Sequence, residues 1–246
     1  ILNIIFSLAL SKVNITLPLG ISFYTFQTMS YSIDVYKGRI KPEINIINFA
    51  TFVTLFPQLI AGPIVKYTDI QNEIKARNIE KDKVQEGIEK FILGLGRKVL
   101  IANNIGMLWS EVENTGFNNI STPFAYVGIL AFSLQIYFDF SGYSLMARGL
   151  GQILGFNFPR NFNYPYASRS ISEFWRRWHI TLGSWFKEYV YIPLGGNRNG
   201  KFRTIINLFV VWALTGLWHG ASFNFIIWGL LFFSLICIEK LGLIRV

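Results

Sequence analysis

The sequence has few charged residues for its length and almost no cysteine. Only 15% of the 246 residues are Asp, Glu, Lys or Arg, whereas 52% are hydrophobic. This balance excludes an ordinary soluble domain. The single Cys237 excludes an intramolecular disulfide and a cysteine-rich cluster, and its apolar surroundings favour a buried, unreactive thiol. Acidic residues do not cluster either, so we expect no metal site.

The sequence contains four long runs without charged residues. They cover residues 13–33, 44–65, 114–138 and 204–238. Because about 20 apolar residues suffice for a helix to cross a bilayer, the sequence predicts an all-α polytopic integral membrane protein. The net charge of +9 comes from basic blocks between these runs, which is the positive-inside pattern of membrane topology. We therefore expect contact with membrane lipid and no binding to nucleic acid.

Several segments depart from simple spans. Pro57, Gly62 and Pro63 interrupt the second run, which has basic residues on both flanks, so we predict a re-entrant element there. Apolar residues at helical spacing from Val84 to Val99 predict an amphipathic helix that leads into a span ending near Trp109.

Two further helical predictions concern the C-terminal half. Ser170 and Glu173 have capping-box spacing, and apolar residues at helical spacing follow as far as Tyr189, which predicts a second interfacial amphipathic helix. The run 204–238 is too long for one perpendicular span. We predict two helices, or one bent helix, interrupted at residues 216–222.

Histidine is as scarce as cysteine, and both histidines occupy unusual positions. His179 ends a run rich in Trp and Arg, and His219 lies inside an apolar run. Histidine titrates near neutrality and ionisable groups are disfavoured in lipid, so His219 is a candidate reaction centre. On the residues alone, a hydrogen-bonded histidine inside a helix bundle fits equally well. His179 also fits a membrane-interface anchor.

Other polar residues have two interpretations each. Asp139 within a span is either a tunnel residue or the partner of a nearby cation. Four cations suit the phosphates of a coenzyme A donor, although positive-inside topology explains each of them as well. They are Arg176, Arg177, Lys187 and Arg198.

Five motifs in order resemble the membrane-bound O-acyltransferase (MBOAT) family. They cover residues 56–65, 135–144, 169–182, 191–198 and 214–221. The motif at 191–198 resembles the alginate O-acetylase-like branch of polysaccharide acetyltransferases more than the D-alanyl transferases. The chain differs from the family pattern at Leu145, where an acid is expected, and at Arg148, where an apolar residue is expected.

The resemblance implies a helical bundle around a tunnel that joins the two membrane faces. It implies that His219 is buried there as the catalytic general base and that His179 is a second catalytic-site residue. Trp218 and Asp139 are our candidates for residues that line the tunnel. Members of this branch are usually about twice as long. Residues 1–246 are therefore predicted to form one membrane domain, the central portion of a longer protein.

The activity implied is transfer of acetyl groups from a cytoplasmic thioester, acetyl-CoA, toward hydroxyls of an extracytoplasmic polysaccharide. The implied location is the bacterial inner membrane, with multiple spans, no permanently bound cofactor and an extracytoplasmic acetyltransferase partner. Three alternatives remain: a D-alanyl-type acyltransferase, a transporter whose buried groups lie on a permeation path, and a non-catalytic scaffold for a secreted acetylase.

Overall fold

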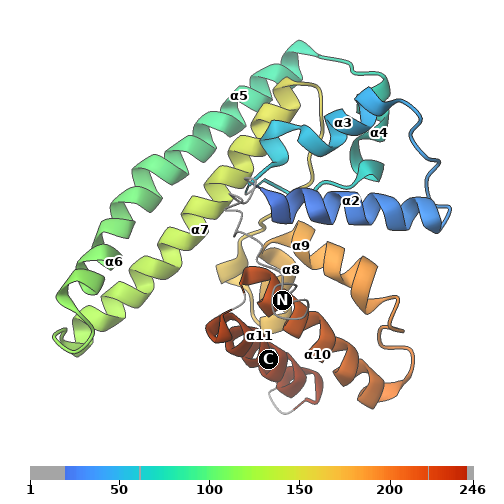
Figure 1. The fold of residues 1–246 in the computed structure, drawn as a ribbon. Helices are drawn as coiled ribbons and strands as arrows, with labels where there is room; N and C mark the ends of the chain where they lie inside the picture. The colour runs from blue at the N-terminus through green and yellow to red at the C-terminus, as the bar shows by residue number, and fades with distance from the viewer. Residues whose placement is uncertain (1–19, 61, 221, 243–246) are drawn as a thin grey trace, which may run out of the picture.

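Every regular element that we can describe is helical, as the sequence predicts (Figure 1). The computed structural model describes residues 20–60, 62–220 and 222–242. The first group of helices comprises α2 (Ile21–Tyr36), α3 (Ile46–Thr54), the 3₁₀ turn η1 (Phe56–Gln58) and α4 (Tyr67–Lys75). Part of the predicted span 13–33 lies outside the described residues.

The predicted break in the run 44–65 is present. α3 ends before Leu55, η1 carries Pro57 in its first turn, and the chain then returns to α4. Gly62 permits this path, because a Cβ there would lie 2.6 Å from the carbonyl oxygen of Pro57. The segment Ile46–Gln58 is apolar but short for a span. Its re-entrance into a bilayer stays a prediction.

A long antiparallel hairpin extends away from the other helices (Figure 1). Its first arm is one continuous helical segment of α5 (Lys81–Gly96), the π-helical η2 (Arg97–Ala102) and α6 (Asn103–Thr115). The second arm is α7 (Thr122–Ile153). The helix predicted from Val84 and the span predicted after it are thus joined without a turn.

The C-terminal group contains the short turn η3 (Pro165–Ala167) and two pairs of helical elements. The first pair is α8 (Ile171–Arg177) and α9 (Ile180–Phe186), with the π-helical η4 (Lys187–Tyr191) continuing α9. The second is α10 (Gly200–His219) and α11 (Phe223–Lys240), so the prediction of two helices within 204–238 is confirmed.

One helical prediction needs correction. Apolar spacing from Ser170 predicts a continuous helix to Tyr189, but the helix breaks after Arg177. Ser170 does begin α8, because its hydroxyl accepts from Glu173 N–H at 3.1 Å. His179 adopts left-handed dihedrals, φ 43° and ψ 54°, which no α-helix contains. Arg176 and His179 therefore do not share one side of a single helix.

Three helices in the described ranges are long and apolar enough to cross a membrane: Lys81–Thr115, Thr122–Ile153 and Phe223–Lys240. Their apolar side chains lie on the outside as well as at packing faces. The hairpin alone exposes Ile92, Leu93, Leu100, Ile129 and Leu130. A surface of this kind is typical of helices that contact lipid tails.

Glycines bring the two arms of the hairpin into direct backbone contact. A Cβ on Gly94 would lie 2.6 Å from Gly142 O, and one on Gly142 would lie 2.7 Å from Gly94 O. In the same way, a Cβ on Gly87 would lie 2.8 Å from Gly149 O, and one on Gly149 would lie 2.5 Å from Gly87 O. Small residues at such positions let membrane helices approach closely, so these two pairs fix the packing of α5 on α7.

We predict that Gly94→Ala destabilises the protein by about 1–3 kcal/mol, since the added methyl group meets backbone atoms that cannot move aside. Gly96 is the matched control, because a Cβ there has no neighbour within 4 Å. Gly96→Ala should leave stability unchanged or raise it by up to about 1 kcal/mol. Thermal unfolding in detergent measures both, and equal effects would contradict the close approach of α5 and α7.

Candidate functional site

His179 lies at the break between α8 and α9 and is 4% exposed. Its ring packs edge to face on Phe140 of α7, with ring centroids 4.8 Å apart. Asn161, in the loop after α7, supports the break: its carbonyl oxygen accepts from Ile180 N–H at 2.9 Å, and its side-chain Oδ1 accepts from Thr181 N–H at 3.2 Å. The left-handed conformation of His179 is thus held by hydrogen bonds from outside its own helix.

The same Asn161 oxygen determines the tautomer of His179. Oδ1 accepts from the Thr181 backbone and from Thr181 Oγ1 at 2.9 Å, and it lies 3.1 Å from His179 Nδ1. Ile64 N–H donates to Thr181 Oγ1, which directs the hydroxyl hydrogen toward Asn161. Since Oδ1 is an acceptor, Nδ1 must carry the proton. The Nε2 atom of neutral His179 is then the unprotonated nitrogen, and it is buried without a partner among the described residues.

Burial also keeps this imidazole neutral. Loss of hydration lowers the pKa of His179 to about 3, and the nearby His219 adds a smaller effect in the same direction. A neutral ring with a free, buried Nε2 can accept a hydrogen bond from a bound group.

Trp218 contacts both histidines. Its ring centroid is 6.3 Å from that of His179 and 4.7 Å from that of His219. His219 ends α10, and its ring centroid also lies 4.8 Å from that of Trp228 in α11. The family resemblance implies a buried His219, but its side chain is exposed in this chain. Trp218 is partly buried, and its Nε1 has no partner among the described residues.

A cavity of about 480 Å³ adjoins His179 between α8, α9, α10 and α11. Arg176 and Lys187 line it, so two of the four predicted donor-binding cations lie at the same cavity as a histidine. Both cations are exposed, whereas the Nε1 of Trp175 and the hydroxyl of Tyr191 on the same wall are buried and unpartnered within the described ranges. The cavity therefore offers polar donors beside a neutral imidazole.

The other two predicted cations lie elsewhere. Arg177 donates to Glu173 from Nε at 2.9 Å and from Nη2 at 2.6 Å, and to the carbonyl oxygen of Asn163 from Nη1. The Arg169 backbone N–H and the Arg177 side chain lower the pKa of Glu173, which keeps this pair ionised. Arg198 is exposed and does not line the cavity.

Asp139 is the partner of a cation, one of its two predicted alternatives. Its carboxylate accepts from Lys98 Nζ on the opposite arm of the hairpin. Asp139 does not line the cavity at His179. Across the described parts of the chain, no group of three His, Cys, Asp or Glu side chains is arranged to hold a metal ion.

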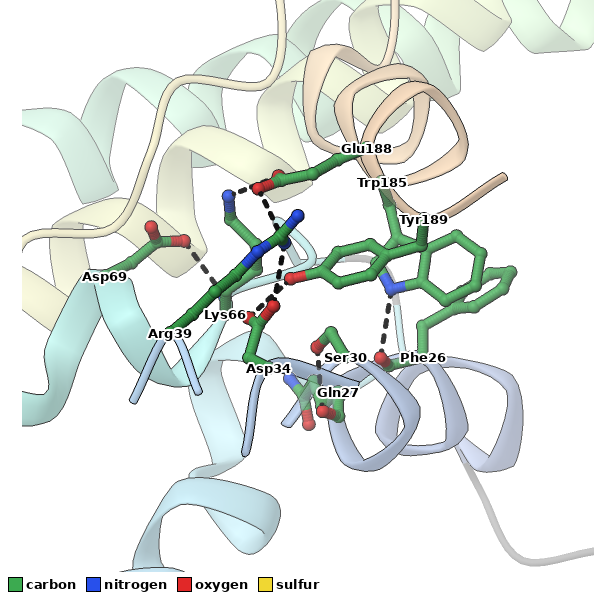
Figure 2. A network of polar contacts seen from close by, with 10 residues as sticks. All are labelled: Phe26, Gln27, Ser30, Asp34, Arg39, Lys66, Asp69, Trp185, Glu188 and Tyr189. Carbon is green, nitrogen blue, oxygen red and sulfur yellow. Dashed lines mark hydrogen bonds and ion pairs between the residues drawn. The ribbon is translucent and has the colours of Figure 1, made fainter. Parts of the chain in front are cut away.

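A polar network around buried Asp34 and Tyr189 fixes α2 against η4 (Figure 2). Tyr189 Oη donates to Asp34 at 2.7 Å, Arg39 pairs with Asp34 at 2.9 Å, and Glu188 pairs with Lys66 at 2.8 Å. Burial and the hydrogen bond to Asp34 raise the pKa of Tyr189, so the phenol remains a donor.

Contacts of aromatic residues connect this polar network to Trp218. Trp185 Nε1–H donates to Phe26 O at 3.0 Å, which fixes α9 against α2. The Phe26 ring in turn lies 5.6 Å from that of Trp218. The polar contacts shown in Figure 2 thus hold α2, and Phe26 of α2 packs against Trp218.

The sequence did not single out Asn161 or Thr181. Asn161 acts on residues 18–20 positions later, across a helix break that the apolar spacing conceals. The only local signal is a polar residue within the aromatic segment 156–166, and many such residues are simply exposed.

The long apolar helices define a polytopic membrane protein, with a buried, neutral histidine at a cavity that Arg176 and Lys187 line. Residues 40–243 match the model of MBOAT, the membrane-bound O-acyltransferase family. The chain belongs to this family of acyltransferases.

Curated relatives include several polysaccharide-modifying proteins. The chain is 50% identical over 216 residues to a probable alginate O-acetylase of Pseudomonas aeruginosa, covering 88% of this chain and 41% of that protein. It is 38% identical to a peptidoglycan O-acetyltransferase of Helicobacter pylori, covering 93% and 48%. It is 31% identical to a teichoic acid D-alanyltransferase of Bacillus subtilis, covering 86% and 56%. The chain thus spans about half the length of these relatives.

We predict that acid weakens the fold through His179. Because the folded pKa, about 3, lies below the ordinary value of 6.5, the unfolded chain binds a proton that the folded protein does not. Stability should fall as the pH drops below about 6.5. His179→Gln removes this contribution, whereas His219 and the carboxyl groups titrate in both proteins. Thermal unfolding at about pH 7 and pH 5 should therefore show a smaller loss of stability in the variant than in wild type. Equal losses would contradict this prediction.

We predict that Asn161→Ala destabilises the protein by about 1–3 kcal/mol for each buried donor that loses its acceptor. It should also release the tautomer of His179. In ¹⁵N-histidine NMR the wild-type ring should show protonated Nδ1 and unprotonated Nε2, and the variant a mixture. Exposed Asn197, for which no side-chain hydrogen bond is found among the described residues, is the matched control. An unchanged spectrum in Asn161→Ala would show that Asn161 does not fix the tautomer.

Proposed function

We propose that the whole protein moves acetyl groups from a cytoplasmic thioester, acetyl-CoA, toward hydroxyls of an extracytoplasmic polysaccharide. The observation that carries this proposal is the contact of both histidines with Trp218, beside a cavity that Arg176 and Lys187 line. The similarity to alginate and peptidoglycan O-acetylases supports acetyl as the group and a polysaccharide as the acceptor.

His219 is proposed as the general base. As the acceptor oxygen attacks the thioester carbonyl carbon, the hydroxyl proton passes to the imidazole of His219 and a new C–O bond forms. The C–S bond then breaks, and the imidazolium returns the proton to the departing thiolate. General-base assistance of this kind contributes about 10²–10⁴-fold in rate. Packing between Trp218 and Trp228 orients the ring for this transfer.

His179 is proposed to hold a reacting partner in place. With Nδ1–H committed to Asn161, its Nε2 is free only to accept. An unprotonated nitrogen cannot stabilise a developing oxyanion, and the low pKa of His179 disfavours proton uptake. This geometry therefore favours a role in orienting a hydroxyl or N–H donor.

The donor is proposed to enter from the cytoplasmic side. Arg176 and Lys187 at the cavity can contact its phosphates. The apolar side chains of Leu182, Leu208 and Val211 line the same cavity and accommodate the chain that carries the thioester. Arg177 is committed to Glu173, and Arg198 lies away from this cavity, so we assign donor contact to Arg176 and Lys187.

The remaining elements of the proposal follow from the membrane setting. A tunnel near Trp218 would let a cytoplasmic donor and an extracytoplasmic acceptor meet in the bacterial inner membrane. A secreted or periplasmic acetyltransferase is the proposed partner that passes acetyl to the glycan. The similarity to a teichoic acid D-alanyltransferase keeps D-alanyl transfer as a second candidate, distinguished by a donor other than acetyl-CoA.

We predict that His219→Ala in the full-length protein lowers acetyl-CoA turnover by about 10²–10⁴-fold without loss of folding. Leu217→Ala, an exposed change on the same helix end, is the matched control and should leave turnover unchanged. The measurement is release of thiol and transfer of radiolabelled acetyl, with thermal unfolding to verify the fold. Full turnover in His219→Ala would support the scaffold alternative, and substrate uptake without thiol release would support the transporter.

A further inference from the structure

A second cavity, of about 240 Å³, lies between the hairpin and the loop that follows α7. Three arginines line it: Arg97 from η2, Arg148 from α7 and Arg160 from the loop. No acidic side chain is among its lining residues. Leu145 and Arg148, where this chain departs from the family pattern, both lie here.

The three guanidinium groups lack carboxylate partners within the described ranges. None of them forms an ion pair there, although Arg148 Nε donates to Phe158 O at 3.2 Å and Arg160 Nε to Phe162 O at 2.6 Å. Both bonds use only Nε, which leaves the terminal nitrogens for other acceptors. Arg97 and Arg148 are half-buried and lie on helices long and apolar enough to cross a membrane, and a half-buried charge without a partner is costly. Convergence of like charges without a counter-charge points to an anionic ligand.

Neutral polar groups complete the lining. Ser141 and Ser144 are each 2% exposed, and neither hydroxyl has a hydrogen-bond partner among the described residues. Asn161 also lines the cavity and is 1% exposed. Its Oδ1 contacts His179 and Thr181, whereas its Nδ2 has no hydrogen-bond partner among the described residues. Buried hydroxyl and amide groups are rarely left unsatisfied in folded proteins. They supply donors of the kind that an anion requires.

We propose that this cavity binds a phosphate group. Three guanidinium groups and three neutral donors exceed what the two oxygens of a carboxylate can satisfy, whereas a phosphate offers more oxygens to guanidinium donors. The phosphate belongs either to a membrane phospholipid or to a soluble phosphoester. Through Asn161, whose Oδ1 contacts His179, the bound phosphate would also steady the candidate catalytic site. The phosphate site does not depend on the proposed acetyl transfer.

The test uses the full-length protein in dodecyl maltoside after removal of bound phospholipid. Inorganic phosphate, compared with chloride at equal ionic strength, should raise the unfolding temperature of wild type. Arg148→Gln should weaken the apparent phosphate affinity by at least about tenfold, because it removes a charge-assisted contact. Arg203→Gln, which removes an exposed positive charge on α10, is the control and should behave as wild type. Ser144→Ala gives a milder variant if Arg148→Gln fails to fold, with a smaller loss expected.

Native mass spectrometry of protein that has not been stripped distinguishes the two sources. Phospholipid retained by wild type and by Arg203→Gln, but lost from Arg148→Gln, would identify a lipid headgroup. Phosphate-dependent stabilisation without retained phospholipid, with competition by coenzyme A, would identify a soluble phosphoester. If phosphate stabilises wild type no more than chloride does, or if the Arg148 and Ser144 variants match Arg203→Gln in both measurements, the proposal is overturned.

Discussion

The hydrogen bonds of Asn161 are the interaction on which the site depends most. A single side-chain oxygen accepts from the backbone and hydroxyl of Thr181 and contacts His179 Nδ1, while the Asn161 carbonyl accepts from Ile180. These bonds satisfy the first N–H groups of α9 and hold His179 in a conformation that non-glycine residues rarely adopt. The helix break at His179 and the tautomer of its ring therefore have one physical cause.

The remainder of the site depends on helices brought together from distant parts of the chain. α2 carries Phe26 to Trp218, and the ion pairs around Asp34 and Glu188 hold α2 against η4. Trp218 then lies against both histidines. Trp218 and His219 are neighbours in sequence, whereas the contacts of Trp218 with Phe26 and His179 join distant residues. The two histidines therefore share a site only once these helices have packed.

Charge is used in two different ways in this molecule. Arg177 pairs with the carboxylate of Glu173 and Lys98 with that of Asp139, so both cations stabilise local structure. Arg176 and Lys187 instead border a cavity without such a partner among the described residues, and Arg97, Arg148 and Arg160 do the same at the second cavity. The net charge of the sequence does not distinguish these residues, whereas the structure separates the cations that pair with carboxylates from those that border cavities.

The sequence by itself determined the helical membrane class, the break near Pro57, the start of α8 at Ser170 and the division of α10 from α11. Each depends on local chemistry: apolar run length, proline geometry, capping and small residues. It also singled out the two histidines through their scarcity and the family motifs. Only the tertiary structure decided that the helix breaks at His179, that Asp139 pairs with Lys98, and that Asn161 orients the imidazole. These features rest on contacts across long sequence separations, which periodicity and propensity do not encode.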